Sequence, residues 1–368
     1  APHTMALCAA ALRRLGRKDE AIALARRAVE IDPIEFLALN ELEVLGVATG
    51  RDKVMRGQVE SYLELASYYE DLGLFEEAAG ILEHYRAEIC KGDCNPLVYY
   101  HLGWANETLG RAAEATAFYE RAAEGNGDHV FAYRREDMLS LQAAIENNDR
   151  DALAHYLLGC LFAWRHHEDK VLPHWTKALK GLSTYPVLLR NIALYYASHK
   201  DYSKALMFYV RALAAAPKDE ELYVEADDTS AKLGRVAERT RLLEKGLKAL
   251  PDSQKIRQLL AQTYYYAQRH DDALDTLMSK EFDHWEGDRR AHQIFVLSHM
   301  DKGKLLLGKR QYEDALVSFQ KAMEYPENLK VGKPAFPRHA PQMYLSAVAY
   351  EALGEHERAR KTLLEGAE

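Results

Sequence analysis

The sequence contains no long apolar run. No stretch of about 18 apolar residues occurs in the 368 residues, so the sequence predicts no segment that spans a membrane. The N-terminal stretch "APHTMALCAAALRRLGRKDEAIAL" lacks the basic start of a signal peptide and soon reads as an amphipathic helix. We therefore expect a cytoplasmic protein with no membrane partner. The absence of an initiator methionine suggests an excised part of a longer protein.

Cysteine is scarce, with four residues at positions 8, 90, 94 and 160. A zinc site would need a second pair of ligands at matching spacing, and none occurs. The stretch "CKGDC" puts Cys90 and Cys94 four residues apart across an expected turn. We expect free thiols in a reducing compartment, and a local disulfide between these two residues is the alternative.

Acidic residues outnumber basic residues, so the formal net charge is -8 and the isoelectric point is about 6.0. A nucleic-acid partner would need a basic face, so none is expected. Hydrophobic residues make up 48% and charged residues 28%, which is typical of a folded chain. Since a single core stops growing at about 250–300 residues, the length favours two domains or a repeat array.

Motifs that carry catalytic chemistry are missing. No GxSxG or HExxH occurs, and the short glycine turns lack the strand and helix of a phosphate cradle. His166, His167 and His174 in "WRHHEDKVLPHW" are better assigned to a polar turn and a helix surface than to a metal site. The acidic stretch "EADD" (225–228) is better assigned to a solvated face. The sequence predicts no enzyme, no cofactor and no bound metal.

What the sequence does contain is a helical hairpin pattern. The stretch "YPVLLRNIALYYASHKDYSKALMFYVRALAAAP" (185–217) predicts two amphipathic helices that end before Pro217. Small residues such as Ala193 and Ala212 alternate with large ones such as Tyr196 and Tyr209. Two helices approach closely where a small side chain faces a large one, so the stretch predicts a packed pair.

The same pattern recurs about every 34 residues. The units begin near residues 2, 59, 96, 152, 185, 220, 254, 294 and 340. Segments such as "YYHLGWANETLGRAAEATAFYERAAE" (99–124) resemble tetratricopeptide repeats, and the many tyrosines occupy the large packing positions. The resemblance implies an all-α fold, a right-handed superhelical solenoid of about nine hairpins over 1–368. We expect no boundary between independent domains, because such repeats do not bury their faces alone.

Three stretches interrupt the repeat. Residues 34–57 and 129–148 predict extra helices that would bend or offset the superhelix. The proline-rich stretch 326–341 predicts a long ordered loop, because Leu329, Val331 and Phe336 are available for burial. Its basic residues could meet an anionic ligand or simply be solvated; the candidates are Lys330, Lys333 and Arg338.

The resemblance also implies a binding groove. In tetratricopeptide arrays the first helix of each hairpin lines the concave face, and matching positions give the candidate groove residues. These are Tyr100, Trp104, Tyr156, Trp164, Arg190, Leu194, Asp228, Gln258, Gln262 and Tyr265. Exposed aromatic side chains in a concavity favour a ligand. The alternative is that Tyr156 and Trp164 pack against the extra helix at 129–148.

A finer resemblance concerns the segments "YEDALVSFQKA", "NNDRDALAHYLLGCLFAWRHHEDKVLPHWTKAL" and "YPVLLRNIALYYASHKDYSKAL". They resemble the C-terminal repeat region of large bacterial proteins whose N-terminal β-rich domain is suspected of acting on carbohydrate. The leading hypothesis is a non-catalytic scaffold that holds a protein or peptide segment, or an upstream domain of the same polypeptide. The alternative hypothesis is an accessory, carbohydrate-contacting region of a bacterial carbohydrate-active enzyme.

Overall fold

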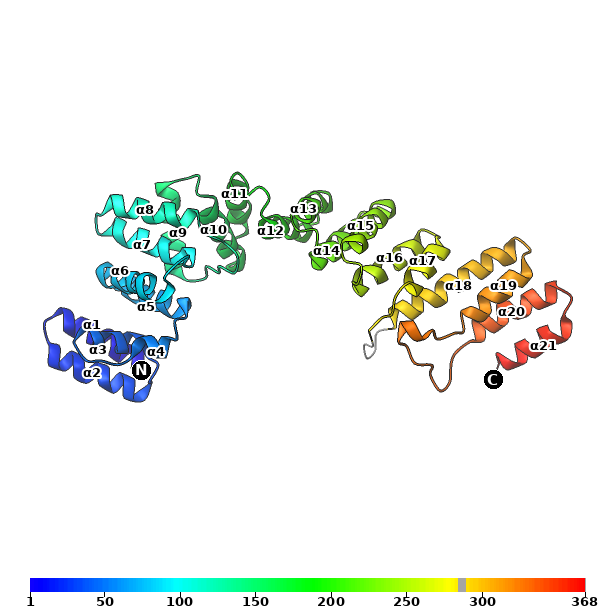
Figure 1. Cartoon of the computed structure of the whole chain (residues 1–368), viewed down its shortest axis with the longest axis horizontal. Helices are drawn as coiled ribbons and strands as arrows, with labels where there is room; N and C mark the ends of the chain where they lie inside the picture. The colour runs from blue at the N-terminus through cyan, green and yellow to red at the C-terminus, as the bar shows by residue number, and fades with distance from the viewer. Residues whose placement is uncertain (284–288, 368) are drawn as a thin grey trace. The chain divides into compact units, whose positions relative to one another are not determined.

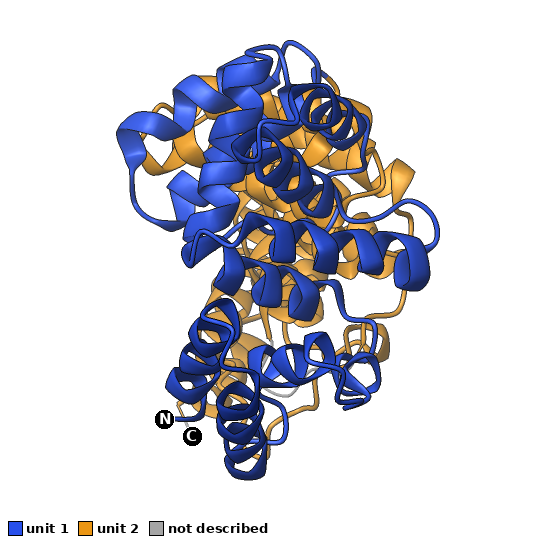
Figure 2. Ribbon diagram, turned by 90° about the vertical axis from the view of Figure 1, so that its left-hand side faces the viewer, with its two compact units in different colours: residues 1–183 blue, residues 184–368 orange. Residues whose placement is uncertain are grey.

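The computed structural model describes residues 1–283 and 289–367 (Figure 1). It divides the chain into two compact units, Ala1–Ser183 and Thr184–Glu368, which are coloured separately in Figure 2. The expected single solenoid over 1–368 stays a prediction.

Unit 1 is an array of helices in which consecutive helices pack antiparallel in pairs, together with a π-helical turn, η1. Its elements are α1 (Pro2–Arg14), α2 (Lys18–Ile31), α3 (Phe36–Val44), α4 (Arg51–Met55), α5 (Val59–Asp71), α6 (Phe75–His84), η1 (Tyr85–Cys90), α7 (Pro96–Thr108), α8 (Ala112–Ala123), α9 (Arg135–Asn147), α10 (Ala152–Trp164) and α11 (Glu168–Ala178).

Unit 2 continues the same kind of pairing, with one short 3-10 helix, η2. Its elements are α12 (Pro186–Ser198), α13 (Tyr202–Ala215), α14 (Glu220–Lys232), α15 (Val236–Ala249), α16 (Gln254–Tyr266), α17 (His270–Met278), α18 (Arg290–Gly308), α19 (Tyr312–Lys321), η2 (Glu327–Leu329), α20 (Ala340–Ala352) and α21 (His356–Glu365). The described residues contain no strand, and the predicted all-α hairpin fold is confirmed.

The turn within a hairpin depends on backbone geometry that glycine tolerates. Gly16, Gly110 and Gly234 have φ angles of 77°, 77° and 67°, in the left-handed region that costs other residues free energy. Each donates its backbone N–H to a carbonyl of the last turn of the preceding helix, at 2.9 Å. These glycines therefore end the first helix and reverse the chain at a fixed position in the repeat.

Close packing inside a hairpin follows the predicted pairing of small and large residues. A Cβ atom added to Gly103 in α7 would overlap the ring of Tyr119 in α8, which is 2% exposed. Gly159 in α10 is covered in the same way by the ring of Trp175 in α11. The helices can approach this closely because the glycines leave room for the rings.

The two interruptions of the repeat take different forms. Residues 34–57 hold two helices, α3 and the five-residue α4, rather than one. The segment 129–148 holds a single helix, α9, which begins only at residue 135 and packs against α7 and α10. The Asp137 side chain accepts a hydrogen bond from the backbone N–H of Arg134, the N-cap of α9, and this bond fixes where α9 begins.

The proline-rich loop 326–341 is anchored at its start. Leu329 is 3% exposed, and the Asn328 side chain donates to the backbone oxygen of Leu277 at 3.0 Å. Phe336 is 91% exposed, so the expectation that this ring would be buried was wrong. The ring lies in a stretch without regular structure.

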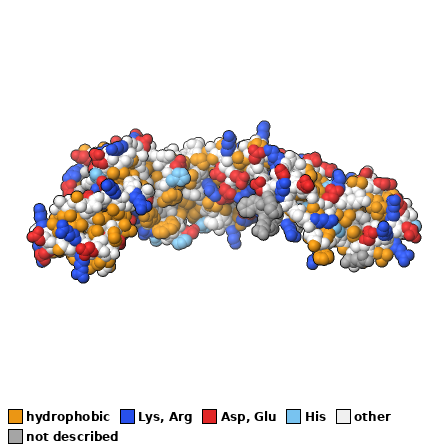
Figure 3. Space-filling model, turned by 60° about the horizontal axis from the view of Figure 1, so that its bottom comes forward, with side chains coloured by type: hydrophobic (Ala, Val, Ile, Leu, Met, Phe, Trp, Pro, Cys, Tyr) orange, Lys and Arg blue, Asp and Glu red, His pale blue; other side chains and the backbone are white. Residues whose placement is uncertain are grey.

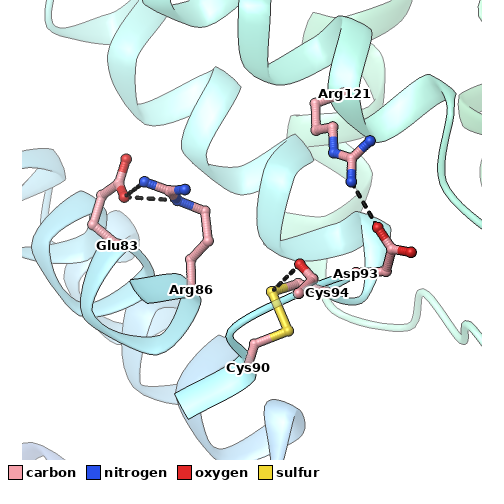
Figure 4. The surroundings of a disulfide bond; sticks show 7 residues. Glu83, Arg86, Cys90, Asp93, Cys94 and Arg121 are labelled. Atoms are coloured by element: carbon pink, nitrogen blue, oxygen red, sulfur yellow. Dashed lines mark hydrogen bonds and ion pairs between the residues drawn. A yellow bond between two sulfur atoms is a disulfide. The ribbon is translucent and has the colours of Figure 1, made fainter. Parts of the chain in front are cut away.

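Cys90 and Cys94 form a disulfide bond that joins the end of η1 to the residue before the α7 cap (Figure 4). The expectation of free thiols was wrong for this pair, and the alternative of a local disulfide is what the structure has. The turn brings the two Cα atoms to 5.8 Å, within the usual span of a disulfide. Between them, Asp93 accepts a hydrogen bond of 2.6 Å from Arg121 in α8. Cys8 and Cys160 are not in a disulfide.

Candidate functional site

Unit 1 carries three exposed aromatic side chains that we call the aromatic patch: Phe131, Tyr133 and Trp164. Their exposed fractions are 69%, 42% and 64%. Phe131 and Tyr133 precede α9, whereas Trp164 ends α10, the helix against which α9 packs. Large aromatic side chains this exposed are a common feature of recognition surfaces.

Two arginines hold the aromatic patch together. The Arg165 side chain donates to the backbone oxygen of Tyr133 at 2.9 Å, and its guanidinium carbon lies 5.9 Å from the centre of the Trp164 ring. The guanidinium of Arg134 lies 4.2 Å from the centre of the Tyr133 ring and binds the Glu60 carboxylate at 2.7 Å. Arg165 therefore links the two segments of chain that supply the patch, and both rings meet a cation.

A buried polar triad anchors the backbone of the patch. Asp137 in α9 accepts hydrogen bonds from the backbone N–H groups of Tyr133 and Arg134, each at 2.8 Å. Its other oxygen lies 2.9 Å from His101 Nε2 in α7, and His101 Nδ1 lies 2.9 Å from Glu70 in α5. All three triad side chains are at most 4% exposed. The segment before α9 is thus tied to two core helices through one histidine.

Electrostatics keep this triad charged. Burial disfavours the His101 cation, but the field of Glu70 and the hydrogen bonds to both carboxylates raise the pKa of His101 to about 10. Burial likewise opposes the Asp137 carboxylate, yet the hydrogen bond from His101 lowers the pKa of Asp137 to about 2. A histidinium between two carboxylates is therefore the state at neutral pH.

The structure separates the four groove candidates of unit 1. Tyr100 is 0% exposed, and its hydroxyl donates to Asp151, the N-cap of α10, at 3.0 Å. Tyr156 is 5% exposed. Neither ring can reach a ligand, so both are corrected to core residues. Trp104 is half-buried and packs edge-on against Phe75, with ring centres 5.1 Å apart. Trp164 alone of the four is exposed.

Groove candidates in unit 2 make contacts with neighbours outside the predicted set. Arg190 binds Glu225 of the next hairpin, with Nε 2.9 Å from the carboxylate, and exposed Asp228 binds Lys232 at 2.6 Å. The half-buried Tyr265 donates to Asp301 at 2.9 Å. Gln258 and Gln262 are half-buried. Leu194 is 42% exposed. A shared groove lined by these residues stays a prediction.

The basic loop candidates do not behave alike. Lys330 forms an ion pair with Glu281, which already neutralises its charge locally. Lys333 is exposed and borders a hollow of about 980 Å³ together with Lys330, Tyr325 and Glu327. Arg338 is exposed. The Glu327 carboxylate also borders this hollow and would repel an anion. An anion site there therefore stays a prediction.

Histidines near the "WRHHEDKVLPHW" stretch form a pair that the sequence did not indicate. His174 Nδ1 lies 2.9 Å from Nδ1 of His155, whose exposed fraction is 1%. Burial, followed by the field of His155, lowers the pKa of His174 to about 4, so both rings are neutral at pH 7. No group of three or more His, Cys, Asp or Glu side chains suited to a metal ion occurs in the described part of the chain.

Charged and hydrophobic side chains are interspersed on the face seen in Figure 3, without one large patch of a single sign.

Sequence reasoning missed Phe131 and Tyr133 in the aromatic patch. The signal was present, since "HVFAYRR" (129–135) places two aromatics beside two arginines just before a helix. Among the residues described here, no helix is long and apolar enough to cross a membrane.

The tetratricopeptide repeat family model matches residues 5–35 and 97–129, which cover the α1–α2 and α7–α8 hairpins. These matches assign the two hairpins to the tetratricopeptide repeat, and the all-α hairpin fold of the described residues is of the same kind.

Similar solved structures include a tetratricopeptide repeat protein from Parabacteroides merdae, 15% identical over 82% of this chain and 98% of that one, with a TM-score of 0.31. YrrB, described as a TPR protein with an unusual peptide-binding site, is 18% identical over 50% and 90%, with a TM-score of 0.36. A thermophilic TPR protein of Thermus thermophilus is 24% identical over 62% and 98%, with a TM-score of 0.25.

Proposed function

We propose that this protein is a non-catalytic scaffold that holds a protein segment, and that the aromatic patch of unit 1 is the contact surface. The observation that carries the proposal is the exposure of Trp164, Phe131 and Tyr133, together with Arg165, which links the Tyr133 segment to Trp164. Aromatic and arginine side chains contribute the largest share of binding free energy in most protein interfaces.

Preorganisation supports this assignment. The patch does not depend on a slack loop, because Asp137 fixes the backbone of Tyr133 and Arg134, and His101 fixes Asp137. A rigid surface loses little conformational entropy on binding, which favours affinity. The paired charges around the patch, Arg134 with Glu60 and Arg135 with Asp71, leave the aromatic faces as its main contact area.

The test compares the wild type with Trp164→Ala and with Phe336→Ala as a matched control. Phe336 is a 91% exposed aromatic outside the patch, so its loss removes similar surface. Proteins captured from source-cell lysate by the wild type would be identified by mass spectrometry, purified and titrated by calorimetry. We expect Trp164→Ala to weaken the affinity at least about tenfold and Phe336→Ala to leave it unchanged. Equal affinities for all three proteins would contradict the proposal.

A carbohydrate ligand is the second candidate, because sugar rings stack on exposed aromatic faces such as those of Trp164 and Phe131. It is distinguished by titrating the same variants with oligosaccharides while following tryptophan fluorescence. A saturable change in the wild type that Trp164→Ala abolishes would favour sugar. No change in the wild type would leave the protein segment as the ligand.

A further inference from the structure

Arg165 is an exposed cation beside the aromatic patch. Its Nη2 atom donates to the backbone oxygen of Tyr133 at 2.9 Å, and its guanidinium carbon lies 5.9 Å from the centre of the Trp164 ring. No ion pair joins Arg165 to an Asp or Glu among the residues that the structure describes. Because a guanidinium has several N–H donors, those that do not bind Tyr133 remain available to a ligand.

The two arginines that follow Tyr133 in the sequence already have carboxylate partners. Arg134 Nη2 lies 2.7 Å from Glu60, and Arg135 Nη1 lies 2.8 Å from Asp71. A ligand carboxylate would have to compete with these ion pairs, whereas at Arg165 it would replace solvent alone. Arg165 is therefore the arginine of this surface at which an added negative charge meets the least competition.

The carboxylates near the patch are each bound by a cation. Glu60 is bound by Arg134, and Asp71 is bound by Arg135. Asp137 is 0% exposed and lies 2.9 Å from the ring of His101. A negatively charged side chain that approaches Arg165 would thus meet carboxylates whose charge is already compensated.

The guanidinium of Arg165 is also held in place before a ligand arrives. Its hydrogen bond to Tyr133 and its position near the Trp164 ring restrict a side chain that would otherwise lose rotamer freedom on binding. The planar fork of a guanidinium matches the two oxygens of a carboxylate. Trp164 is 64% exposed, so an apolar group that covers its ring would also exclude water from the neighbouring cation and strengthen an ion pair there.

We propose that the protein segment held by the aromatic patch is acidic. A side-chain carboxylate of its Asp or Glu pairs with Arg165, and a neighbouring apolar side chain of the segment packs on the Trp164 ring. This inference rests on the proposed function, to which it adds the charge of the partner.

A carboxylate fits this surface better than a phosphate group. A phosphorylated side chain carries a charge of about −2 and is usually bound by a cluster of arginines. Here Arg134 and Arg135 are engaged with Glu60 and Asp71, which leaves the single charge of Arg165 for the ligand. One guanidinium balances one carboxylate.

The test begins with a library of random peptides displayed so that neither end carries a free carboxylate. The full chain selects binders from it, and peptides that also bind Trp164→Ala are removed. We expect the remaining peptides to contain more Asp and Glu than the starting library, next to apolar residues. Each would then be synthesised together with a copy in which Asn or Gln replaces the acidic residue.

Calorimetry of each peptide and its amide copy measures the contribution of the carboxylate. With the wild type we expect the acidic peptide to bind at least about fivefold more tightly than its copy. With Arg165→Gln the two should bind equally. If Arg165 only held the Tyr133 segment in place, its loss would weaken both peptides by the same factor, and that result would overturn the proposal.

Two further variants serve as controls, and helical melts by circular dichroism check the fold of each protein. Arg165→Lys keeps the charge without the planar fork, so it should retain a smaller preference for the acidic peptide. Arg26 is exposed on α2, outside the patch, and pairs with no carboxylate of the described residues. Arg26→Gln removes the same charge and should keep the full wild-type preference.

The outcomes separate this inference from the proposed function. A selection that yields no peptide dependent on Trp164 would contradict the proposed function and the inference together. Peptides that depend on Trp164 but contain no excess of Asp and Glu, or that bind Arg165→Gln as tightly as the wild type, would overturn the inference alone.

Discussion

The Nδ1 atom of His101 lies 2.9 Å from both carboxylate oxygens of Glu70, in a site where neither side chain is exposed by more than 4%. With Asp137 on the other ring nitrogen, the histidine joins α5, α7 and α9. Removing one partner of such a group leaves an uncompensated buried charge, which is strongly destabilising.

His101→Gln should lower the free energy of unfolding by about 3–5 kcal/mol near pH 6. The folded pKa of His101 is raised to about 10, above the unfolded value of about 6.5, so the folded state retains a proton that the unfolded state loses. This stabilisation is complete below pH 6.5 and disappears as the pH rises towards 10. Urea unfolding at pH 6 and pH 9.5 should therefore show a smaller difference between wild type and variant at the higher pH.

The control for that experiment is His356→Gln, because His356 is 71% exposed and pairs only with Glu351. It should change stability by no more than about 0.5 kcal/mol at either pH. A difference in unfolding free energy between wild type and His101→Gln that is the same at pH 6 and pH 9.5 would contradict the charged triad.

The His155–His174 pair should make the protein sensitive to acid. The pKa of His174 is lowered to about 4, so the unfolded state binds a proton that the folded state does not as the pH falls below 6.5. Stability should fall by up to about 1.4 kcal/mol per pH unit between pH 6.5 and pH 4 from this group. His174→Gln keeps a donor for His155 and should show a shallower decline. The unfolding free energy of both proteins would be measured by chemical denaturation. An equally steep fall with decreasing pH in the wild type and in His174→Gln would contradict the neutral pair.

Gly103→Ala should destabilise the α7–α8 hairpin, because the added methyl group would overlap the Tyr119 ring in a closely packed site. Overpacking of this kind costs about 1–3 kcal/mol. Gly80→Ala in α6 is the matched control, since an added Cβ there meets no atom within 4 Å. It should be neutral or stabilising by up to about 1 kcal/mol, through helix propensity alone. Thermal melts of both variants would show whether the two substitutions differ as expected.

Thiol counting tests the disulfide. In denaturant without reductant, two of the four cysteines should react with a thiol reagent, and all four should react after reduction. Cys90→Ser with Cys94→Ser should lower the unfolding free energy by at most about 2 kcal/mol, because the closed loop is short. Four reactive thiols in the untreated protein would show that the bond is absent.

Several features of the candidate site could be predicted from the sequence, and others could not. Trp164 was identified from its repeat position and is exposed, whereas Tyr100 was assigned to the same surface and is buried. Both match the groove-facing positions of the repeat, but the N-cap of α10, Asp151, accepts a hydrogen bond from Tyr100 and covers it. The covering residue lies 51 positions away in sequence, so no local pattern could indicate it.

The amino-acid sequence by itself determined the hairpin. Small residues that face large ones, a period near the length of two helices and, in hairpins such as α7–α8, a turn glycine with positive φ specify the pairs locally. These interactions join residues that are close together in the chain.

Tertiary structure alone decided which side chains of the repeat stay exposed, how His101 came to lie between two carboxylates and how Arg165 came to join the Tyr133 segment to Trp164. Those outcomes depend on α9, which breaks the repeat and packs between α7 and α10. A helix outside the periodic pattern changes burial at distant positions, and burial is what separates a core residue from a binding residue.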